Sequence, residues 1–454
     1  ERQASVGWLL ENTRLAADLG GLLRASHDVD RALSRLALER GGPRDMAAIR
    51  DTAAIAAKVR ERLSGDAPSG IASAAENLVG LAEIVDLLDA ALVAEPPLLS
   101  RDGGYVAPGY DADLDDAREL RDHGRGVIAG MQADYAELAG VSSLKIKHNN
   151  VLGYFIETTA THAEKMMAPP LNETFIHRQT TANQIRFTTV KLSEIETRIL
   201  NAGAHALEIE KRVYAELAAA IIADADRISA MARALAEIDV ALSMAALARD
   251  EDWCRPELDA SRAFEITGGR HPVVEAALRK SGEPFVANDC DLSSAPIWLL
   301  TGPNMAGKST FLRQNALIAI LAQAGGYVPA ASAHIGIVSQ IFSRVGASDD
   351  LAGGRSTFMV EMNETAAILN NLTDRSLVLL DEIGRGTSTY DGVSLAWSIA
   401  EYIHSHPSAP KTLFATHYHE LNELESKCPG IVNFHISIKE QGAQIVFLRK
   451  LTRG

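Results

Sequence analysis

Apolar residues recur at helical spacing through most of the first 250 positions of this 454-residue chain. The spacing is clear over residues 13–94, where glycine-containing breaks at 20–21, 41–43 and 65–70 divide it into short segments. A loop with Pro96 and Pro97 follows, and the helical pattern resumes over residues 113–139. The first third of the chain is therefore predicted to be a series of helices.

A longer helical pattern covers residues 191–249, with no proline and a single glycine, Gly203. At 1.5 Å per residue, about sixty helical residues would span roughly 90 Å, more than one globular domain. We therefore expect a break near residues 224–226. The pattern allows two arrangements: two ordinary helices of a bundle, or an arm that projects and returns with residues 139–191 at its tip.

The residues between these two helical patterns have a different character. Segments 144–146 and 154–158 alternate like strands, and 175–189 favours further strands with a polar face. Between residues 143 and 191 six Lys and Arg outnumber three Glu, whereas the whole chain carries a net charge of −15. Any contact with DNA must therefore be local. The local positive balance suits contact with a phosphate backbone, and a merely solvated surface fits the composition equally well.

The second half of the chain contains an apolar run, 297–300, that leads into TGPNMAGKST at 301–310. Gly302, Gly307, Lys308 and Ser309 fit the phosphate-binding loop of nucleotide triphosphatases. Glycines let backbone N–H groups surround phosphate oxygens, the lysine reaches the β- and γ-phosphates, and the hydroxyl ligates Mg²⁺. Residues 311–323 then fit a helix whose N-terminus faces the phosphates.

Two further apolar runs carry polar residues toward the same expected sheet edge. Residues 376–382 read SLVLLDE, which places Asp381 where it can hold the water shell of Mg²⁺ and Glu382 where it can orient or deprotonate the attacking water. The run 412–416 delivers His417, which can sense or position the γ-phosphate. A solvated strand end and a buried structural imidazole are the alternatives, and three such features in this order argue against them.

The segment 344–362, RVGASDDLAGGRSTFMVEM, departs from an ordinary P-loop enzyme. Ser356 and Thr357 follow a Gly-Gly turn and are expected at or near a helix N-terminus, which favours anions. Because the chain's own nucleotide already has its ligands, this helix is expected to reach the nucleotide of a second copy, as in ABC-type ATPases. A dimer with composite sites follows as an expectation.

The bulk composition indicates the general class of protein, but it says little about the chemistry that the protein performs. Hydrophobic residues make up 47% and charged residues 23% of the chain, as in ordinary globular proteins, and no run approaches the 18 apolar residues of a membrane span. Three widely spaced cysteines indicate reduced thiols in the cytoplasm. Because the chain opens with glutamate and has no secretory leader, we expect a piece of a longer protein.

Taken together, the motifs resemble those of one family. TGPNMAGKST, DDLAGGRSTFMVEM, DEIGRGTSTYDG (381–392) and FATHYHEL (414–421) closely resemble the MutS DNA mismatch-repair ATPases, and GGRHPVVE (268–275) is similar to the segment that opens their ATPase domain. The resemblance covers essentially the whole chain and is densest over 268–421. At Ala306 many members carry glycine, and a methyl group there should be tolerated.

The resemblance implies a multidomain fold with an α-helical lever, a small β-rich clamp inserted in it, and an α/β P-loop ATPase domain of the ABC type. The implied boundaries are 1–142 for the helical core and lever, 143–190 for the DNA clamp, 191–262 for the returning lever helix and 263–454 for a C-terminally truncated ATPase domain. ATP or ADP and Mg²⁺ are the implied cofactors. Duplex DNA, a second copy of the chain and a MutL-type repair protein are the implied partners, with no membrane, in the bacterial cytoplasm and associated with the nucleoid.

These implications assign roles to individual residues. Glu382, His417 and Lys308 are expected to act in catalysis, and Ser309 and Asp381 to hold Mg²⁺, the latter through water. Phe285 matches the family aromatic that stacks on adenine, with a buried core phenylalanine as the alternative, and Ser356 is expected to contact the nucleotide of the other subunit. The nucleotide-binding loop residues are Gly302, Pro303, Asn304, Met305, Ala306, Gly307, Lys308, Ser309 and Thr310. The DNA-contacting clamp residues are Lys145, Lys147, Arg178, Gln179, Thr180 and Asn183.

One feature of the family is expected to be absent. Mismatch reading in the family depends on an N-terminal domain with a Phe-x-Glu wedge, and the match at 155–157 lies in an expected strand, so we interpret it as coincidence. The chain is therefore expected to keep the ATPase and the backbone grip without lesion discrimination. A MutS-like paralogue acting on recombination intermediates stays open. Another ABC-class machine is disfavoured, because no LSGGQ-type signature occurs and the arm precedes the P-loop.

Overall fold

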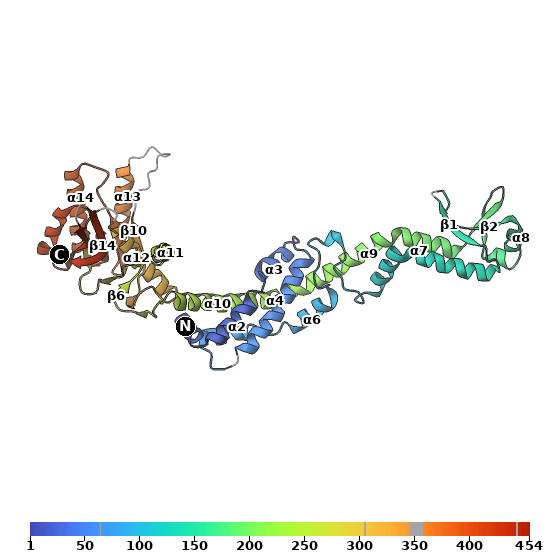
Figure 1. Cartoon of the computed structure of the whole chain (residues 1–454), viewed down its shortest axis with the longest axis horizontal. Coiled ribbons are helices and arrows are strands. Elements are labelled where there is room, and N and C mark those ends of the chain that lie inside the picture. Colours follow the sequence, from blue (N-terminus) through green and yellow to red (C-terminus); the bar gives the residue numbers. More distant parts are fainter. Residues whose placement is uncertain (64, 150, 304–305, 346–356, 442–443) are drawn as a thin grey trace. The chain divides into compact units, whose positions relative to one another are not determined.

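Helices form most of the first 250 residues in the computed structural model of the chain, and strands and helices alternate thereafter (Figure 1). The structure describes residues 1–63, 65–149, 151–303, 306–345, 357–441 and 444–454. The chain divides into two units: one contains Glu1–Gly20, Ser64–Ser73 and Glu237–Gly454, and the other contains Gly21–Leu63 and Ala74–Ala236. It is a mixed α/β protein of more than one domain.

Most of the expected breaks separate the early helices. Helix α4 (Pro43–Arg62) starts at the 41–43 break with Pro43 in its first turn, and α5 (Ser69–Glu76) follows the 65–70 break. The break expected at 20–21 is wrong, because α2 (Thr13–Leu23) continues through both glycines at a propensity cost that other contacts offset. The remaining helices of this region are α1 (Arg2–Glu11), α3 (Val29–Ala37), α6 (Ala82–Ala91), η1 (Ser100–Asp102) and α7 (Ala112–Ala139).

The long helical pattern forms two helices. Helix α9 (Val190–Ala223) begins after Thr189, whose hydroxyl accepts a hydrogen bond from the Leu192 N–H at 2.9 Å, and α10 (Ala225–Asp250) follows after Asp224. The expected break at 224–226 is thereby confirmed. Helices α7 and α9 lie side by side and lead to a small sheet, which favours the arm that projects and returns (Figure 1).

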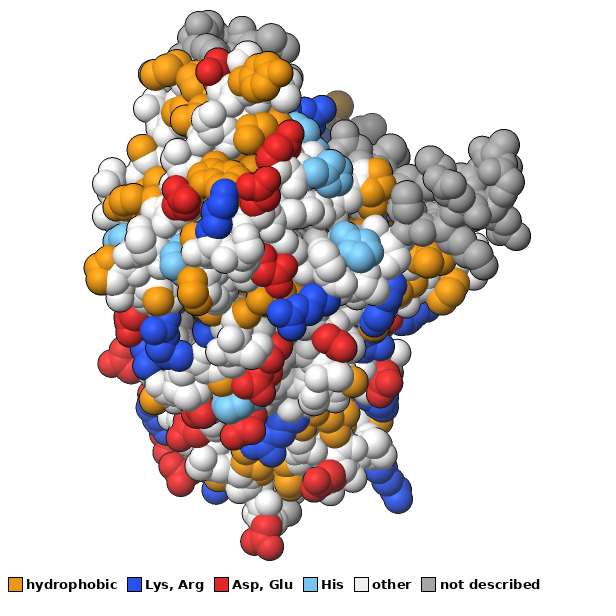
Figure 2. Space-filling model, turned by 90° about the vertical axis from the view of Figure 1, so that its left-hand side faces the viewer, with side chains coloured by type: hydrophobic (Ala, Val, Ile, Leu, Met, Phe, Trp, Pro, Cys, Tyr) orange, Lys and Arg blue, Asp and Glu red, His pale blue; other side chains and the backbone are white. Residues whose placement is uncertain are grey.

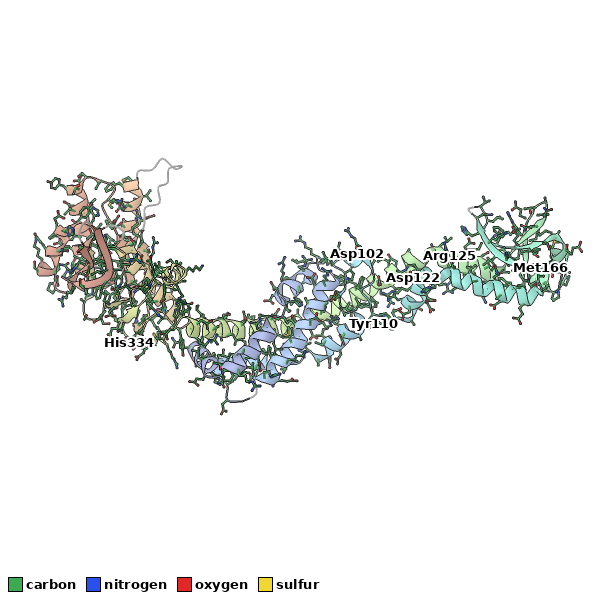
Figure 3. All side chains as sticks on the ribbon, in the orientation of Figure 1. Asp102, Tyr110, Asp122, Arg125, Met166 and His334 are labelled. Carbon is green, nitrogen blue, oxygen red and sulfur yellow. The ribbon has the colours of Figure 1, made fainter. Side chains whose placement is uncertain are left out.

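The small sheet is antiparallel, in the order β1-β2-β4-β3. Ile156 and Phe187 on one of its faces pack against Ile128 and Met131 of α7. Helix α8 and the turn η2 connect the two halves of the sheet, and the buried Met166 ends α8 (Figure 3). The bounds are β1 (Lys145–Asn149), β2 (Gly153–Thr159), α8 (Ala160–Met166), η2 (Leu171–Glu173), β3 (Ile176–Thr180) and β4 (Gln184–Thr188).

The other unit is built on a six-stranded sheet in the order β10-β11-β12-β8-β13-β14, parallel except for β14. Trp298 and Leu300 of β8 join one hydrophobic cluster with α12, and Ile297 and Leu299 join another with α14. Burial on both faces explains the continuous apolar runs. The bounds are β8 (Ile297–Thr301), α12 (Lys308–Gln323), β10 (Gln340–Arg344), β11 (Ser376–Asp381), α14 (Thr389–Ser405), β12 (Lys411–Ala415), β13 (Ile431–Gln441) and β14 (Gln444–Arg453).

A second sheet in this unit has the order β5-β9-β6-β7. Its inward residues include Phe264 and Ile335, which join the cluster that contains α12. The bounds of its strands and of the remaining helices are β5 (Glu257–Asp259), β6 (Phe264–Gly269), α11 (Pro272–Ser281), β7 (Asn288–Asp291), β9 (Ser332–Gly336), α13 (Thr357–Leu369), η3 (His419–Glu423) and α15 (Leu424–Lys427).

The described surface shows no dominant patch of one kind in the view of Figure 2, where acidic and basic side chains are interspersed with hydrophobic ones. No helix in the described part of the chain is both long and apolar enough to cross a membrane.

Candidate functional site

Four parallel strands of the six-stranded sheet end at one edge. The register pairs Leu300 of β8 with Ala415 of β12, and Ala415 with Asp381 of β11. Leu380 in turn pairs with Arg344 of β10. The residues that follow these strands, including the loop after Thr301, therefore lie along one carboxyl edge, which is where ligands bind in open α/β sheets.

The loop after β8 has the backbone of a phosphate-binding turn. Gly302 and Gly307 have φ values of 138° and 112°, which favour glycine, and α12 begins directly at Lys308. Ala306 is not among the described residues with positive φ, so its methyl group does not strain the loop. Asn304 and Met305 lie outside the described residues. The first turn of α12 presents N–H groups to this edge of the sheet.

Lys308 is only 5% exposed and folds back over the loop. Its ammonium donates hydrogen bonds to the carbonyl oxygens of Gly302 at 2.5 Å and Pro303 at 3.2 Å. Burial lowers the pKa of Lys308, and the carboxylates of Glu382 and Asp381 act in the opposite direction. A buried cation whose only hydrogen-bond partners among the described residues are two carbonyl oxygens is suited to exchange them for phosphate oxygens.

Ser309 and Asp381 are in direct contact. The hydroxyl of Ser309 donates a hydrogen bond of 2.5 Å to Asp381 Oδ2. Burial raises the pKa of Asp381, against the Ser309 hydrogen bond, which lowers it. The other oxygen, Oδ1, is buried and has no hydrogen-bond partner in the described part of the chain. A hydroxyl beside a carboxylate with a spare oxygen is a donor set that fits Mg²⁺.

Glu382 follows β11 with a φ of 53°, an uncommon backbone conformation for a residue other than glycine. Its N–H donates to the Ala415 carbonyl at 2.9 Å, which ties the turn to β12. Its carboxylate accepts a 2.7 Å hydrogen bond from the Arg385 guanidinium. Arg385 is largely exposed, so this ion pair lies at the surface and can open at low cost.

The turn after Glu382 is held by two buried side chains. Glu361 of α13 accepts a hydrogen bond from the Gly384 N–H at 2.7 Å, and the Tyr418 hydroxyl donates to the Gly384 carbonyl at 3.0 Å. Both side chains are at most 5% exposed. The sequence did not indicate these two side chains. Glu361, for example, binds the backbone of a residue 23 positions away, and such a contact leaves no local sequence pattern.

His417 lies two residues beyond the end of β12 and is exposed, next to the ring of Tyr418 at a centroid distance of 4.1 Å. It is therefore not a buried structural imidazole. Ser356 lies outside the described residues. The helix expected near it is present as α13, which begins at Thr357.

A cavity of about 280 Å³ adjoins the loop and contains Phe285 in its wall. Phe285 is partly buried there, together with Gly307 and Thr310 of the loop. The cavity brings together residues that the sequence pattern did not single out, because β14 supplies part of the wall from more than 130 positions downstream. These additional wall residues are Val274, Leu278, Val286, Asn288, Phe311, Gln314, Ile436, Arg449 and Leu451.

The six expected DNA-contacting residues lie in the small sheet and, for Asn183, in the turn between β3 and β4. The side chains of Lys145, Arg178 and Asn183 are exposed and form no hydrogen bond or ion pair with other described residues. Arg178 is the extra residue of a bulge in the edge strand β3, between His177 and Gln179. A bulge of this kind redirects a side chain away from the regular strand.

The other three expected residues have partners within the sheet. Lys147 pairs with the buried Glu157 at 2.5 Å, and Gln179 accepts a hydrogen bond from Arg186 at 2.9 Å. Thr180 shares a hydrogen bond of 2.9 Å with His177. Lys147 is thus partly neutralised by Glu157, a pairing across β1 and β2 that the charge count did not reveal.

The Phe155–Glu157 segment is no projecting wedge. Phe155 is 3% exposed beneath the Arg186 guanidinium, which lies 4.5 Å from its ring centroid. Glu157 is bound by Lys147 and Arg186, which lower its pKa against the effect of burial. The interpretation of this motif as coincidence agrees with its burial.

Two models of one protein family match the chain: MutS domain V over residues 298–454 and MutS family domain IV over residues 109–204. Curated relatives from Ruegeria pomeroyi, Paracoccus denitrificans and Dinoroseobacter shibae are each called DNA mismatch repair protein MutS. They are 64%, 63% and 63% identical to the chain over 458, 456 and 456 residues. Each alignment covers 100% of this chain and 52% of the relative, so the chain spans about half the length of these relatives.

Proposed function

This chain belongs to the MutS family, and we propose that it is the ATPase, lever and clamp portion of a DNA mismatch-repair protein. In this proposal residues 1–142 and 191–262 form the helical core and lever, 143–190 the clamp, and 263–454 an ATPase domain of the ABC type. ATP binding and hydrolysis control the hold of the clamp on duplex DNA. The observation that carries the proposal is the Ser309–Asp381 contact beside the buried Lys308.

Nucleotide binding in this proposal exchanges contacts that the loop now makes with itself. The Lys308 ammonium leaves the carbonyls of Gly302 and Pro303 for the β- and γ-phosphates. The N–H groups at the start of α12 surround the phosphate oxygens. Phe285 stacks on the adenine in the adjoining cavity, whose position next to Gly307 and Thr310 supports this role.

Ser309 and Asp381 are the residues that would hold Mg²⁺, Asp381 through a water molecule. The bound cation would neutralise charge on the phosphates. The unpartnered Oδ1 of Asp381 supports this assignment, because a buried carboxylate oxygen without a donor is costly until a cation or its water shell arrives.

Glu382 is the proposed group that orients and deprotonates the attacking water. The exposed Arg385 now binds Oε2 of this carboxylate, and the ion pair can open at low cost when the carboxylate takes up a proton. Glu361 and Tyr418 hold the following turn and so position Glu382. His417, exposed at the same edge, is proposed to contact the γ-phosphate.

The active form is proposed to be a homodimer in which Ser356 of one chain completes the nucleotide site of the other. The connection of α13 to the Glu382 turn through Glu361 supports this role, because α13 follows the segment that contains Ser356. Binding of the partner's nucleotide near Ser356 would thereby affect the position of the Glu382 carboxylate. A MutL-type partner and a cytoplasmic, nucleoid-associated location complete the proposal.

DNA binding is proposed for the exposed polar side chains of the small sheet. Lys145, Arg178 and Asn183 are free to contact phosphates, whereas Lys147, Gln179 and Thr180 first have to leave partners within the sheet. Such contacts carry no sequence information. The clamp should therefore hold matched and mismatched duplexes equally well.

ATP hydrolysis by the purified chain tests the proposal. Phosphate release should require Mg²⁺, stop on chelation with EDTA and change on addition of duplex DNA. Asp374→Asn, which removes an exposed carboxylate just before β11, should leave the rate unchanged. Phosphate release that continues in EDTA, or no release under any condition including a high chain concentration, would contradict the proposed activity.

A further inference from the structure

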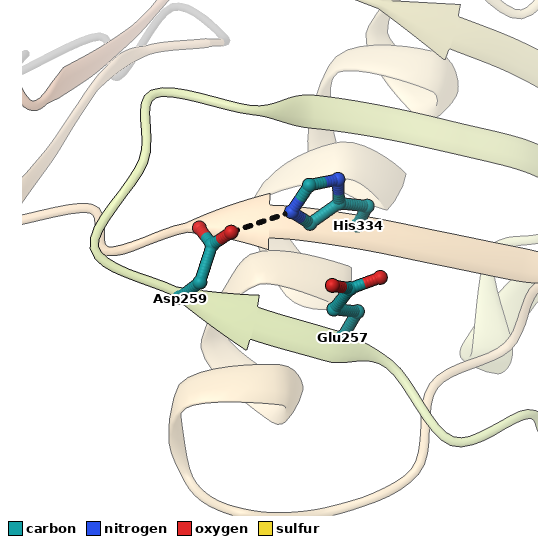
Figure 4. Close-up of side chains that lie close together, drawn as sticks. All are labelled: Glu257, Asp259 and His334. Atoms are coloured by element: carbon teal, nitrogen blue, oxygen red, sulfur yellow. Dashed lines mark hydrogen bonds and ion pairs between the residues drawn. The ribbon is translucent and has the colours of Figure 1, made fainter.

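A group of metal-ligating side chains lies on the β5-β9-β6-β7 sheet, outside the site described above. The parallel register of β5 and β9 pairs Glu257 with His334. Successive residues of a strand point to opposite faces. Ala333 and Ile335 enter the core, so His334 faces outward together with Glu257 and Asp259 (Figures 3 and 4).

The three side chains are close enough to share one ion. One ligand atom from each residue lies within 4.8 Å of the others. The His334 Nε2 atom is 2.9 Å from Asp259 Oδ2 (Figure 4). Two ligand atoms that share one ion at about 2.0–2.2 Å lie at most about 4.4 Å apart, so small side-chain rotations would bring all three ligands to one centre.

Asp259 is already oriented by its neighbours. Its Oδ1 atom accepts hydrogen bonds from the Ser261 N–H at 2.9 Å and the Ser261 hydroxyl at 2.5 Å. These contacts leave Oδ2 directed at the imidazole. A ligating carboxylate that is fixed through its second oxygen is typical of metal sites in proteins.

The local charge favours a divalent cation. Glu265 of β6 pairs with His334 from the other side, so three carboxylates surround one imidazole. No Lys or Arg in the described ranges forms an ion pair with Glu257, Asp259 or Glu265. A protonated imidazole compensates only one of the three negative charges, whereas a divalent cation compensates two.

We propose that Glu257, Asp259 and His334 form a binding site for a first-row divalent transition metal, with Zn²⁺ as the expected ion. An imidazole with two carboxylates is a donor set for such metals, whereas Mg²⁺ prefers oxygen ligands alone. The metal would join β9 to the edge strand β5, which has only three residues. It would thereby fix the strand that follows α10 after a six-residue connection.

Zn²⁺ titration of the nucleotide-free chain, in excess Mg²⁺, tests this site by competition with a chromophoric chelator. The wild-type chain should show one Zn²⁺ site that His334→Ala and Glu257→Gln each weaken at least tenfold. Glu265→Gln is the matched control, because it removes a carboxylate next to His334 that lies outside the three-residue group. Its Zn²⁺ affinity should stay within about threefold of wild type. All variants keep the three cysteines, so any Zn²⁺ binding by their thiols is the same in every titration.

The Glu257→Gln variant is not expected to disturb folding, because the Glu257 side chain is exposed and makes no hydrogen bond with the described residues. Zn²⁺ should also raise the thermal unfolding temperature of the wild-type chain and of Glu265→Gln, but not of Glu257→Gln. Equal Zn²⁺ affinity in the wild type and Glu257→Gln would overturn the proposal, as would the absence of saturable binding. Neither result bears on ATP hydrolysis.

Discussion

The Ser309 hydroxyl donates a hydrogen bond of 2.5 Å to Asp381 Oδ2, across 72 positions of sequence. This contact joins the first turn of α12 to the end of β11, two elements that adjoin through the parallel sheet. Burial raises the pKa of Asp381, so the folded chain holds the charge of this carboxylate at a cost in free energy. Removing this charge is therefore expected to change the stability of the chain and its ATP hydrolysis in opposite directions.

Asp381→Asn should stabilise the nucleotide-free chain and abolish hydrolysis. The amide oxygen can still accept the Ser309 hydrogen bond without a buried charge, so we expect a gain of about 1 kcal/mol in the free energy of unfolding. Since the folded-state pKa of Asp381 is raised, the wild type loses stability as pH rises through the carboxyl range, and the variant should lose less. Thermal unfolding from pH 4 to pH 7 measures both. A variant less stable than wild type at pH 7 would contradict this account of Asp381.

Phe285→Ala should weaken ATP binding, because the ring lies in the cavity wall beside Gly307 and Thr310. Base–aromatic stacking contributes about 1–3 kcal/mol, or roughly 5- to 150-fold in affinity. Tripolyphosphate, which has no base, is the control ligand and should bind both proteins equally. Unchanged ATP affinity in a folded variant would assign Phe285 to the core instead.

Glu361→Ala should slow hydrolysis while leaving ATP affinity nearly unchanged. Its loss frees the Gly384 N–H and loosens the turn that positions Glu382, which we expect to lower kcat by about tenfold, or about 1.4 kcal/mol. Glu361→Gln keeps an acceptor oxygen and should recover most of the rate. Asn363→Ala, at an exposed position of the same helix, controls for surface effects. A parallel loss of ATP affinity and rate in Glu361→Ala would show a general defect rather than positioning of Glu382.

Arg178→Ala should weaken duplex DNA binding more than Lys147→Ala. Arg178 is exposed on its bulge and forms no ion pair with the residues that the structure describes, whereas Lys147 is paired with Glu157. Loss of one phosphate contact should reduce the salt dependence of log K by about 1. Fluorescence anisotropy at several salt concentrations measures this with a matched duplex and with a mismatched one. A larger effect at Lys147, or an unchanged slope in Arg178→Ala, would refute this ranking.

Much of the candidate site at the sheet edge could be predicted from the sequence, because parallel strands buried on both faces leave unbroken apolar runs. The position of Asp381 opposite Ser309 follows from such runs and from strand order. The break at Asp224 could likewise be predicted, because about sixty uninterrupted helical residues would exceed the length of one globular domain. These features are local or follow from general rules of α/β sheets.

Features that depend on tertiary contacts could not be predicted. Helix α2 runs through Gly20 and Gly21 although both residues disfavour helix, and α8 was not recognised within a segment of strands. The pairing of Lys147 with Glu157 became visible only once β1 and β2 were in register. Arg449 reaches the cavity of Phe285 because β14 returns beside β13, a contact without a sequence signal.

We propose that the edge formed by β8, β11 and β12 hydrolyses ATP with separate groups for binding and for attack. The decisive experiment measures ATP affinity and single-turnover hydrolysis on the same protein samples. It compares wild type, Lys308→Ala and Glu382→Ala at a chain concentration that supports dimers. The account predicts weakened ATP binding in Lys308→Ala, and near wild-type binding with hydrolysis slowed at least a hundredfold in Glu382→Ala. Hydrolysis by Glu382→Ala at the wild-type rate would contradict it.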